Sequence, residues 1–217
     1  MLCRPDRRCL SAFAMFVVVS LLMVFGSTLV WDDAVLREIG DTRTPGITNL
    51  MLLATMLGDG VIEAPFALGV MVLLWRLRRG QAAKRYALAA LSGWALYALA
   101  KAAFQRERPS IITRLHDAGW YSYPSGHAML APLVWSFALI LLAESVTSRA
   151  ARISMMILAV LIPIAIAISR VYLGVHYPSD VLGALLLGTA WMLLWRAVPP
   201  PGESASSTNR SGGVRSP

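Results

Sequence analysis

Charged residues and cysteines are scarce in this chain. Only 15% of its 217 residues are charged, whereas 57% are hydrophobic, a balance that soluble domains of this length rarely approach. The two cysteines, Cys3 and Cys9, both lie in a short basic N-terminal segment. We place that segment in the reducing cytoplasm, where a disulfide between them is not expected. The low charge argues against an ordinary soluble domain and favours an integral membrane protein.

Acidic residues are also few, since 12 Asp and Glu stand against 20 Lys and Arg, which gives a formal net charge of +8. The basic residues do not form one face or stripe, so we expect no nucleic acid partner. They stand instead in short clusters between apolar runs. Such clusters are typical of the loops that join membrane helices.

Long apolar runs are abundant in the sequence. Because a bilayer core of about 30 Å needs roughly 20 apolar residues per helix, we predict an all-α integral membrane bundle of six transmembrane helices. The first run is longer than the apolar region of a signal peptide, about 7 to 15 residues, and lacks a clear small-x-small cleavage site, so we expect it to be retained. The predicted spans are 10–31, 61–77, 85–104, 127–144, 152–169 and 180–196.

The chain divides into three parts. Residues 1–9 form a cytoplasmic N-terminus, residues 10–197 form the transmembrane domain, and residues 198–217 are a Pro/Ser/Gly-rich cytoplasmic tail that we expect to be disordered. Residues 32–60 are more polar, with an apolar patch at 48–57 that either lies in the interface or re-enters the membrane.

The distribution of positive charge predicts the orientation. With six spans, 13 of the 20 Lys and Arg residues fall on the side of the two termini. By the positive-inside rule this side is cytoplasmic, which places every histidine on the outer side. The remaining 7 are Arg37, Arg43, Lys101, Arg106, Arg108, Arg114 and Arg170.

The stretch SYPSGHA (122–128) places a histidine at the head of a long apolar run. Ser125 follows a proline and is predicted to be a helix N-cap, with Gly126 and His127 in the first turn. The unpaired N–H groups at such a helix start, next to a glycine that permits close approach, can bind an anion. Taken alone, the fragment is equally consistent with an ordinary helix start that carries an exposed histidine.

The stretch KAAFQRERP (101–109) brings two cations to the outer end of the third span. Lys101 and Arg108 are seven residues apart, about two helical turns, so they point the same way if the helix continues. An ammonium group so near the hydrocarbon usually faces a polar cavity or partner. The alternative is that Lys101 snorkels to the interface.

The stretch SRVYLGVHYPSD (169–180) joins the fifth and sixth spans. It places Arg170 at the end of one helix, His176 in or beside the connection and Asp180 at the start of the next helix. A carboxylate that holds one ring nitrogen leaves the other a fixed, more basic lone pair, which prepares a histidine nucleophile. The alternative is a capping Asp180 and a structural His176.

The three stretches together carry three cations, two histidines, a carboxylate and a glycine-bearing helix start, all on one membrane face. Guanidinium groups match phosphate oxygens and neutralise the charge that develops in phosphoryl transfer. The combination therefore predicts a phosphate pocket. Two histidines and an aspartate could ligate Zn²⁺, but three neighbouring cations would oppose a divalent ion, so we expect no metal site.

The same stretches resemble the three-part signature of the type 2 phosphatidic acid phosphatase (PAP2) superfamily, whose soluble relatives include bacterial acid phosphatases and vanadium haloperoxidases. The motifs are K-x6-RP at 101–109, PSGH at 124–127 and SR-x5-H-x3-D at 169–180, in order and without a substitution. The signature covers residues 101–180, and the six-span layout extends the likeness over most of the chain. The resemblance implies a PAP2/haloperoxidase-like core.

The resemblance also implies a role for each residue of the site. His176 would attack phosphorus to give a phosphohistidine, and Asp180 would orient and polarise it. His127 would protonate the leaving oxygen and then activate water. No metal or other cofactor is implied. The phosphoryl oxygens would be bound by Lys101, Arg108, Ser125, the backbone amide of Gly126, and Arg170.

On this resemblance we expect a lipid phosphatase of a bacterial cytoplasmic (inner) membrane, with its site facing the periplasm or exterior. The substrate would be a lipid phosphate or diphosphate whose tail enters from the bilayer. Undecaprenyl diphosphate is the first choice, followed by phosphatidylglycerol phosphate, phosphatidate and lipid A phosphate. The alternatives are a lipid phosphotransferase with the same intermediate and a non-enzymatic lipid-phosphate binder or carrier. The membrane architecture disfavours haloperoxidase activity.

Further residues of these segments receive weaker assignments. His116 is expected to be solvated or on the substrate side. Arg106 and Arg114 are candidates for contacts with a second phosphate or a head group. Glu63 is a candidate partner for one of the cations. The aromatic residues expected in an interfacial belt, or at the border of a lipid entry gap, are Trp120, Tyr121 and Tyr123.

Overall fold

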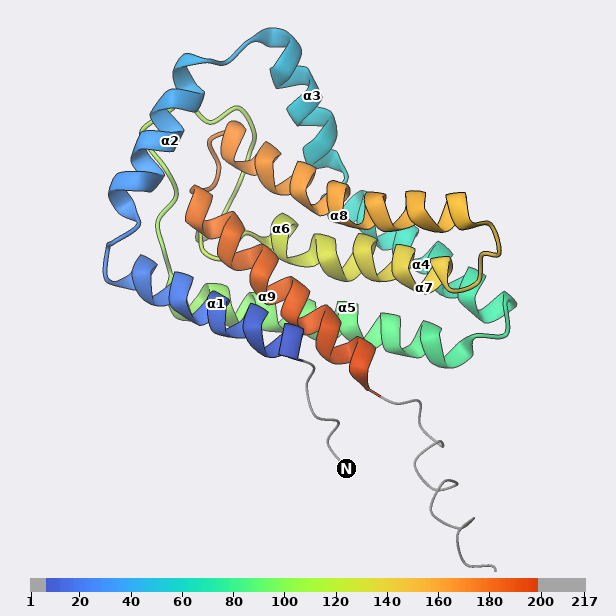
Figure 1. The fold of residues 1–217 in the computed structure, drawn as a ribbon. Coiled ribbons are helices and arrows are strands. Elements are labelled where there is room, and N and C mark those ends of the chain that lie inside the picture. The colour runs from blue at the N-terminus through green and yellow to red at the C-terminus, as the bar shows by residue number, and fades with distance from the viewer. Residues whose placement is uncertain (1–6, 199–217) are drawn as a thin grey trace, which may run out of the picture.

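The computed structural model describes residues 7–198, and every regular element within that range is helical. Cys3, most of the predicted N-terminal segment and all but the first residue of the predicted tail lie outside the described residues. Figure 1 shows the helices gathered in a bundle, with α2 and α3 forming an arch at one end. The helices are α1 (Arg7–Val24), α2 (Leu29–Asp41), α3 (Pro45–Met56), α4 (Gly60–Arg76), α5 (Gly80–Phe104), α6 (Gly126–Ala131), the π-helical turn η1 (Pro132–Ser136), α7 (Phe137–Ala143), α8 (Arg149–Tyr172) and α9 (Pro178–Ala197).

The helices confirm the predicted all-helical membrane bundle. In the described part of the chain, five stretches are long and apolar enough to cross a membrane: α1, α5, the continuous run from α6 to α7, α8 and α9. A sixth crossing results if α3 and α4, which meet at an angle of 47°, are counted together. Each predicted span after the first coincides with one of these helices.

The first predicted span, 10–31, is wrong at its C-terminal end. α1 ends at Val24, the chain turns at Gly26, and α2 begins at Leu29. Gly26 has a φ of +73°, a left-handed conformation that glycine adopts without steric cost and that commonly ends a helix. The apolar run therefore continues through a turn that hydropathy alone does not detect.

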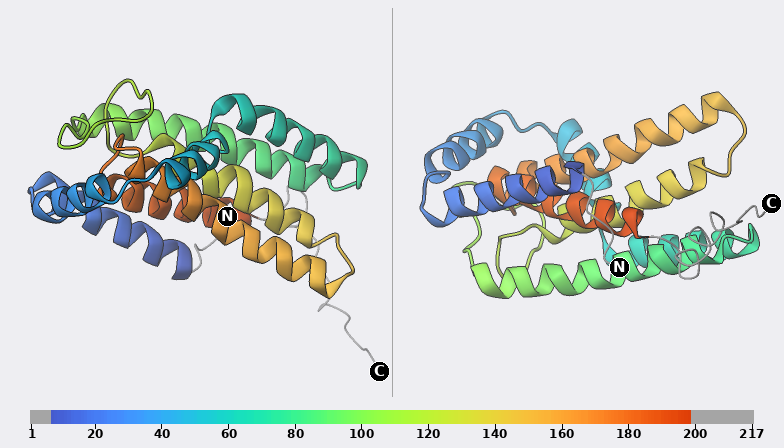
Figure 2. Two further views of the ribbon diagram at one scale, coloured as in Figure 1. Left: turned by 90° about the horizontal axis from the view of Figure 1, so that it is seen from above. Right: turned by 60° about the horizontal axis from the view of Figure 1, so that its bottom comes forward.

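The segment Gly126–Ala143 forms the centre of the bundle. In it 61% of the residues are buried, against 22% in the corresponding windows of α1 and α8. Glycines on neighbouring helices permit this close packing, because a Cβ on Gly188 of α9 would lie 2.2 Å from the carbonyl oxygen of Met129. α5, α8 and α9 all contact this segment, and Figure 2 shows them around it. The helix start that carries the PSGH motif is thus held on several sides.

The N-terminal helix lies along α9. The thiol of Cys9 is buried and donates a hydrogen bond to the carbonyl oxygen of Ala190, at 3.3 Å. The apolar patch that was expected to lie in the interface or to re-enter forms most of α3, which packs against α8. α1 and α3 therefore support the two helices, α9 and α8, that flank the third sequence motif.

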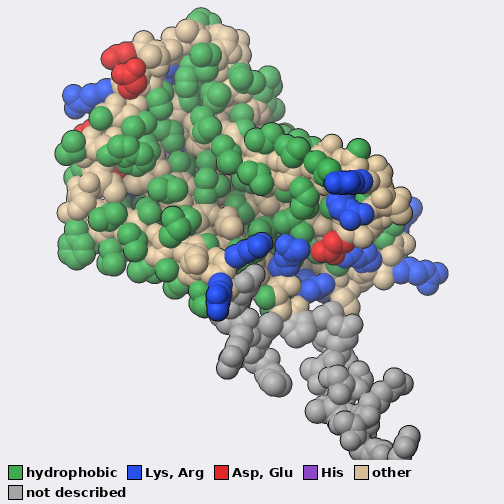
Figure 3. All heavy atoms as spheres, in the orientation of Figure 1, with side chains coloured by type: hydrophobic (Ala, Val, Ile, Leu, Met, Phe, Trp, Pro, Cys, Tyr) green, Lys and Arg blue, Asp and Glu red, His purple; other side chains and the backbone are tan. Residues whose placement is uncertain are grey.

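Basic side chains gather at one end of the molecule in Figure 3. They lie at the α4–α5 and α7–α8 junctions, at the start of α1 and at the end of α9. The opposite end carries the arch of α2 and α3 and the loop 105–125. All three sequence motifs lie at that opposite end.

Candidate active site

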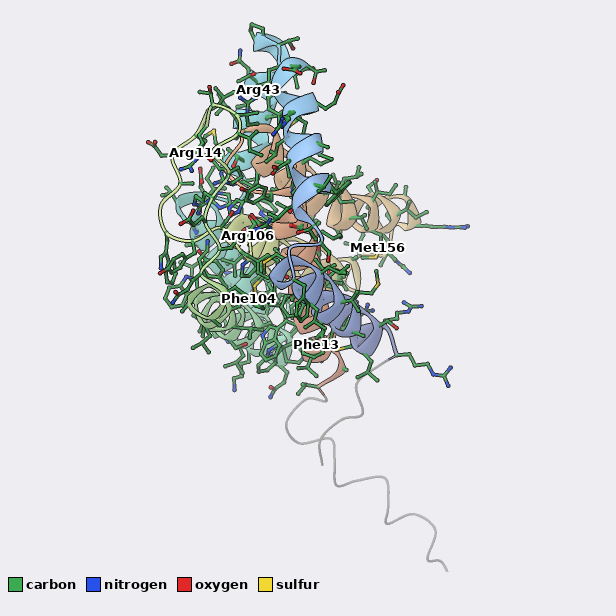
Figure 4. All side chains as sticks on the ribbon, turned by 90° about the vertical axis from the view of Figure 1, so that its left-hand side faces the viewer. Phe13, Arg43, Phe104, Arg106, Arg114 and Met156 are labelled. Atoms are coloured by element: carbon green, nitrogen blue, oxygen red, sulfur yellow. The ribbon has the colours of Figure 1, made fainter. Side chains whose placement is uncertain are left out.

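The three motifs meet where α5 and α8 end and where α6 and α9 begin. The backbone N–H of Ser125 donates to the carbonyl oxygen of Asp180 at 3.3 Å, which joins the starts of α6 and α9. His127 and His176 therefore lie at the same end of the bundle. Figure 4 shows Arg106 close to these helices and Arg114 farther out in the loop 105–125.

His176 and Asp180 form a buried pair. Nδ1 of His176 lies 3.4 Å from Oδ2 of Asp180, and both residues are at most 2% exposed. The same Oδ2 accepts the backbone N–H of Tyr177 at 2.9 Å and the hydroxyl of Ser122. Asp180 therefore caps α9 and holds the imidazole at once.

The ring of His176 presents its second nitrogen to Arg108. Nε2 lies 3.2 Å from NH1 of that guanidinium, which can only donate, so Nε2 carries the lone pair and Nδ1 the proton. Burial, reinforced by the charges of Arg108 and Arg170 and opposed by Asp180, lowers the pKa of His176 to about 3. The imidazole is therefore neutral at physiological pH, which is the form that a nucleophile requires.

Arg108 reaches the site from a loop and not from a helix. α5 ends at Phe104, and Gln105 adopts a left-handed conformation with φ 47°, so the helix does not continue to residue 108, which was the condition for Lys101 and Arg108 to point the same way. The guanidinium is instead fixed by carbonyl oxygens, with NH1 2.7 Å from that of Val175 and NH2 2.7 Å from that of Gly119. Loop 105–125 is thereby tied to the segment that carries His176.

The other two predicted phosphate-binding cations are both buried. Lys101 is 2% exposed, with its ammonium 5.0 Å from the ring centroid of Tyr97 and 5.9 Å from that of Trp120, so it does not snorkel. Arg170 is 3% exposed and donates from NH1 to Oγ1 of Thr55 at 2.6 Å. Its Nε has no hydrogen-bond partner among the described residues.

Ser125 and Gly126 start the central helix as the sequence predicted. Ser125 occupies the N-cap position, but its side chain makes no cap hydrogen bond, and its buried Oγ has no partner among residues 7–198. Tyr97 covers Gly126 so closely that a Cβ there would lie 2.9 Å from its ring. Tyr97 therefore fills the space beside the Cα of Gly126, and the unpartnered hydroxyl of Ser125 is the buried polar group left for a ligand.

The sequence reasoning missed the partner of His127. Nε2 of its imidazole lies 2.9 Å from Oδ1 of Asp59, which stands just before α4. One feature of the sequence could have drawn attention to Asp59, because it stands between two glycines at the head of an apolar run, in the stretch LGDG. This feature does not identify His127 as the partner of Asp59, because the two residues are 68 positions apart in the sequence.

The interpretation of Arg106 as a head-group contact is wrong. Its guanidinium donates to Oδ2 of Asp32 at 2.7 Å and to Oδ1 of Asp180 at 2.6 Å, and its side chain is only 9% exposed. Both carboxylates are fully buried. Arg106 is thus engaged inside the protein, where it neutralises the carboxylate behind His176.

Other weaker assignments also change. Tyr123 is fully buried and shares a hydrogen bond of 2.7 Å with Ser20, so it does not belong to an interfacial belt, whereas Trp120 is 57% exposed. Within residues 7–198, Glu63 has no cation partner and its buried Oε1 makes no hydrogen bond. Among residues 7–198, Nδ1 of His116 hydrogen-bonds only the carbonyl oxygen of Asp117, at 2.7 Å, but the charge of His116 also acts on His127.

An apolar cavity of about 600 Å³ opens beside the site. At one end it is lined by Gly126, His127 and Tyr97, and farther along by small and apolar side chains of α4 and α5. Glu63 lines it between these parts. Among residues 7–198 no group of three or more His, Cys, Asp or Glu side chains is placed to hold a metal ion.

Comparison with known proteins identifies relatives of this arrangement. The PAP2 superfamily model matches residues 82–201, a range that includes all three motifs. Phosphatidylglycerophosphatase B of Bacillus subtilis (strain 168) is 27% identical over 179 residues, which cover 82% of this chain and 88% of that protein. An undecaprenyl-diphosphatase of Sulfolobus acidocaldarius is 42% identical over 69 residues, which cover 32% of this chain and 29% of that protein.

The fold has a solved counterpart as well. A crystal structure of a transmembrane PAP2 type phosphatidylglycerolphosphate phosphatase from Bacillus subtilis superimposes with a TM-score of 0.83 at 25% sequence identity. The superposition covers 88% of this chain and 95% of that one. The likeness therefore extends over nearly all of the described helices.

Proposed function

This chain belongs to the PAP2 superfamily, and from that premise we propose that it hydrolyses a lipid phosphate or diphosphate through a phosphohistidine formed on His176. It is an integral membrane protein and a phosphoric ester hydrolase, as its helices and its relatives establish. The observation that carries the finer proposal is the buried His176–Asp180 pair, with Arg108 against the second ring nitrogen.

In the first step, the lone pair on Nε2 of His176 attacks phosphorus, and the bond from phosphorus to the leaving oxygen breaks. That oxygen belongs to the lipid alcohol in a monophosphate and to the lipid monophosphate in a diphosphate. Asp180 accepts the Nδ1–H bond and stabilises the positive charge that develops on the ring. The protonated imidazole of His127 gives its proton to the leaving oxygen. The lipid product departs, and the phosphoryl group stays on His176.

In the second step, neutral His127 takes a proton from water, and the resulting hydroxide attacks phosphorus. The phosphorus–nitrogen bond breaks, its electron pair returns to Nε2, and inorganic phosphate leaves. His127 is then protonated again, and His176 is neutral. Both steps use the same two histidines, which agrees with their location at one end of the bundle.

The phosphoryl oxygens find donors in several elements. Lys101, Arg108 and Arg170 supply positive charge, and the N–H of Gly126 adds a backbone donor. Two buried polar groups, Oγ of Ser125 and Nε of Arg170, have no partner among the described residues. Such unpaired buried groups are costly unless a ligand satisfies them, so a bound phosphate gives each of them a role.

The substrate is proposed to be a lipid because the apolar cavity begins at His127 and Gly126. A hydrocarbon chain attached to the reacting phosphate can lie along this cavity, since its walls are apolar farther from the site. The names of the relatives point to two lipids, phosphatidylglycerol phosphate and undecaprenyl diphosphate. Undecaprenyl diphosphate remains our first choice because the site is proposed to face outward, which suits recycling of a carrier lipid.

The proposed location is a bacterial cytoplasmic membrane, with both termini in the cytoplasm and the site facing the periplasm or exterior. The gathering of basic side chains at the end opposite the site supports this orientation.

The proposed function is tested by phosphate release from purified protein with EDTA present and without added metal. The panel contains undecaprenyl diphosphate, phosphatidylglycerol phosphate, phosphatidate and a lipid A phosphate, each in the same detergent micelles. Release of inorganic phosphate from at least one of them is expected. Transfer of label to a second lipid without free phosphate would identify a phosphotransferase. If neither free phosphate nor a labelled second lipid formed, both activities would be rejected.

Narrowing the cavity should reduce activity on long-chain lipids. Ala67 lines the cavity, so Ala67→Phe is expected to lower kcat/KM for a long-chain lipid phosphate about 10-fold, because overfilling such a space costs on the order of 1–3 kcal/mol. A short-chain phosphate that does not reach residue 67 should react as before. Ala14→Phe, on an exposed face of α1, is the matched control and should change neither rate. An equal loss of kcat/KM on both substrates would show that the lipid tail does not lie in this cavity.

A further inference from the structure

His127 has a carboxylate partner of its own. Oδ1 of Asp59 lies 2.9 Å from Nε2 of the imidazole, and the two residues come from the segment before α4 and the first turn of α6. Asp59 occupies the N-cap position of α4, where an aspartate side chain usually accepts a helix N–H. It makes no such bond here. The carboxylate is therefore committed to the imidazole and not to the helix.

The backbone that carries Asp59 is fixed against the ring. A Cβ on Gly58 would lie 2.7 Å from Cδ2 of His127, so only a glycine allows the chain to pass so close. The carbonyl oxygen of Leu57 accepts a hydrogen bond from Nε1 of Trp135 at 2.9 Å, and the N–H of Gly58 donates to the carbonyl oxygen of Thr55 at 2.9 Å. Segment 57–59 is thus attached to α3 and to η1 of the central segment, which limits the positions the carboxylate can take.

The second ring nitrogen of His127 remains available. No hydrogen bond joins Nδ1 to any of residues 7–198, and the side chain is 23% exposed where it lines the cavity. Since Nε2 is held by Asp59, Nδ1 is the nitrogen that can face a leaving group. The arrangement mirrors the other histidine, in which Asp180 holds Nδ1 and Nε2 is the reacting atom.

We propose that Asp59 is a positioning residue that fixes the orientation of the His127 imidazole and stabilises the protonated form of that imidazole. This inference rests on the proposed phosphatase activity. When Nδ1–H is given to the leaving oxygen, Nε2–H stays hydrogen-bonded to the carboxylate. When water is activated in the second step, Nδ1 accepts the proton and the carboxylate stabilises the imidazolium that forms. Asp59 itself gains and loses no proton.

The role is tested with two phosphate monoesters that carry the same alkyl chain, one with an aliphatic alcohol and one with a nitrophenol as leaving group. An aliphatic alkoxide needs a proton from His127, whereas a nitrophenolate leaves without one. The constant kcat/KM reports formation of the phosphohistidine in both cases. Asp59→Asn is expected to lower it about 100-fold for the aliphatic ester, in the range of general acid catalysis, and less than threefold for the aryl ester.

Controls separate this outcome from damage to the fold and from failure of the proposed function. Asp41→Asn, at an exposed position at the end of α2, should leave both constants unchanged. Stabilisation of Asp59→Asn by vanadate in thermal unfolding should match that of the wild type, because the phosphate pocket is intact. Equal loss on both esters, no loss on the aliphatic ester, or loss of vanadate stabilisation would overturn the role. A wild type that cleaves no lipid phosphate would instead refute the proposed function.

Discussion

Replacing His176 with asparagine is expected to lower phosphate release by at least about 1,000-fold, since loss of a nucleophile removes the covalent route entirely. The side chain is 2% exposed and Asp180 holds its Nδ1, so Nε2 is the nitrogen placed to attack. The measurement is the initial rate with a labelled lipid phosphate. After an alkaline quench, the wild-type protein should retain phosphoryl label and the His176→Asn variant should retain none.

His116→Ala is the matched control for this experiment. Among the described residues its ring hydrogen-bonds only the carbonyl oxygen of Asp117, and its charge is the smallest of the influences on His127, so its loss should leave the rate within a factor of two, a difference of less than about 0.5 kcal/mol. Wild-type turnover in His176→Asn would reject the phosphohistidine. If label stayed on the protein while turnover was lost in His127→Ala, the second histidine would be assigned to the hydrolytic step.

Replacing Arg106 with methionine is expected to lower the free energy of unfolding by about 3–5 kcal/mol, the usual cost of leaving a buried charge without its partner. Here the guanidinium of Arg106 forms ion pairs with two fully buried carboxylates, Asp32 at 2.7 Å and Asp180 at 2.6 Å. Activity should fall as well, because Asp180 would lose the cation that holds it behind His176. Denaturant unfolding in detergent and the rate on one lipid phosphate measure the two effects.

Arg114→Met tests whether the effect is specific. Arg114 belongs to the same loop but is exposed and donates only to the carbonyl oxygen of Pro109, so its replacement should change the free energy of unfolding by less than about 0.5 kcal/mol. In the double variant Arg106→Met, Asp32→Asn, part of the stability should return because one buried charge has been removed. Equal effects of the two arginine replacements would contradict the assigned role of Arg106.

Several candidate residues of the site could be predicted from the sequence, because their residue types and their spacing are those expected of a phosphate-binding pocket with a paired histidine and carboxylate. His176 and Asp180 are four positions apart across a helix start, so local geometry alone brings the carboxylate to the ring. Ser125 and Gly126 begin a helix because a proline precedes them and an apolar run follows. The argument for Arg108 depended on a continuing helix, whereas a loop carries this residue to the site.

The sequence by itself determined that the chain is a membrane-spanning helical bundle with cations and paired histidines at one end, because hydropathy and motif spacing are properties of short segments. Only the tertiary structure decided that Asp59 holds His127, that Arg106 joins Asp32 to Asp180, and that Tyr123 is buried. The first of these contacts links residues 68 positions apart, and the bond from Arg106 to Asp32 links residues 74 apart. Such partners depend on how helices pack, and no pattern within one segment encodes them.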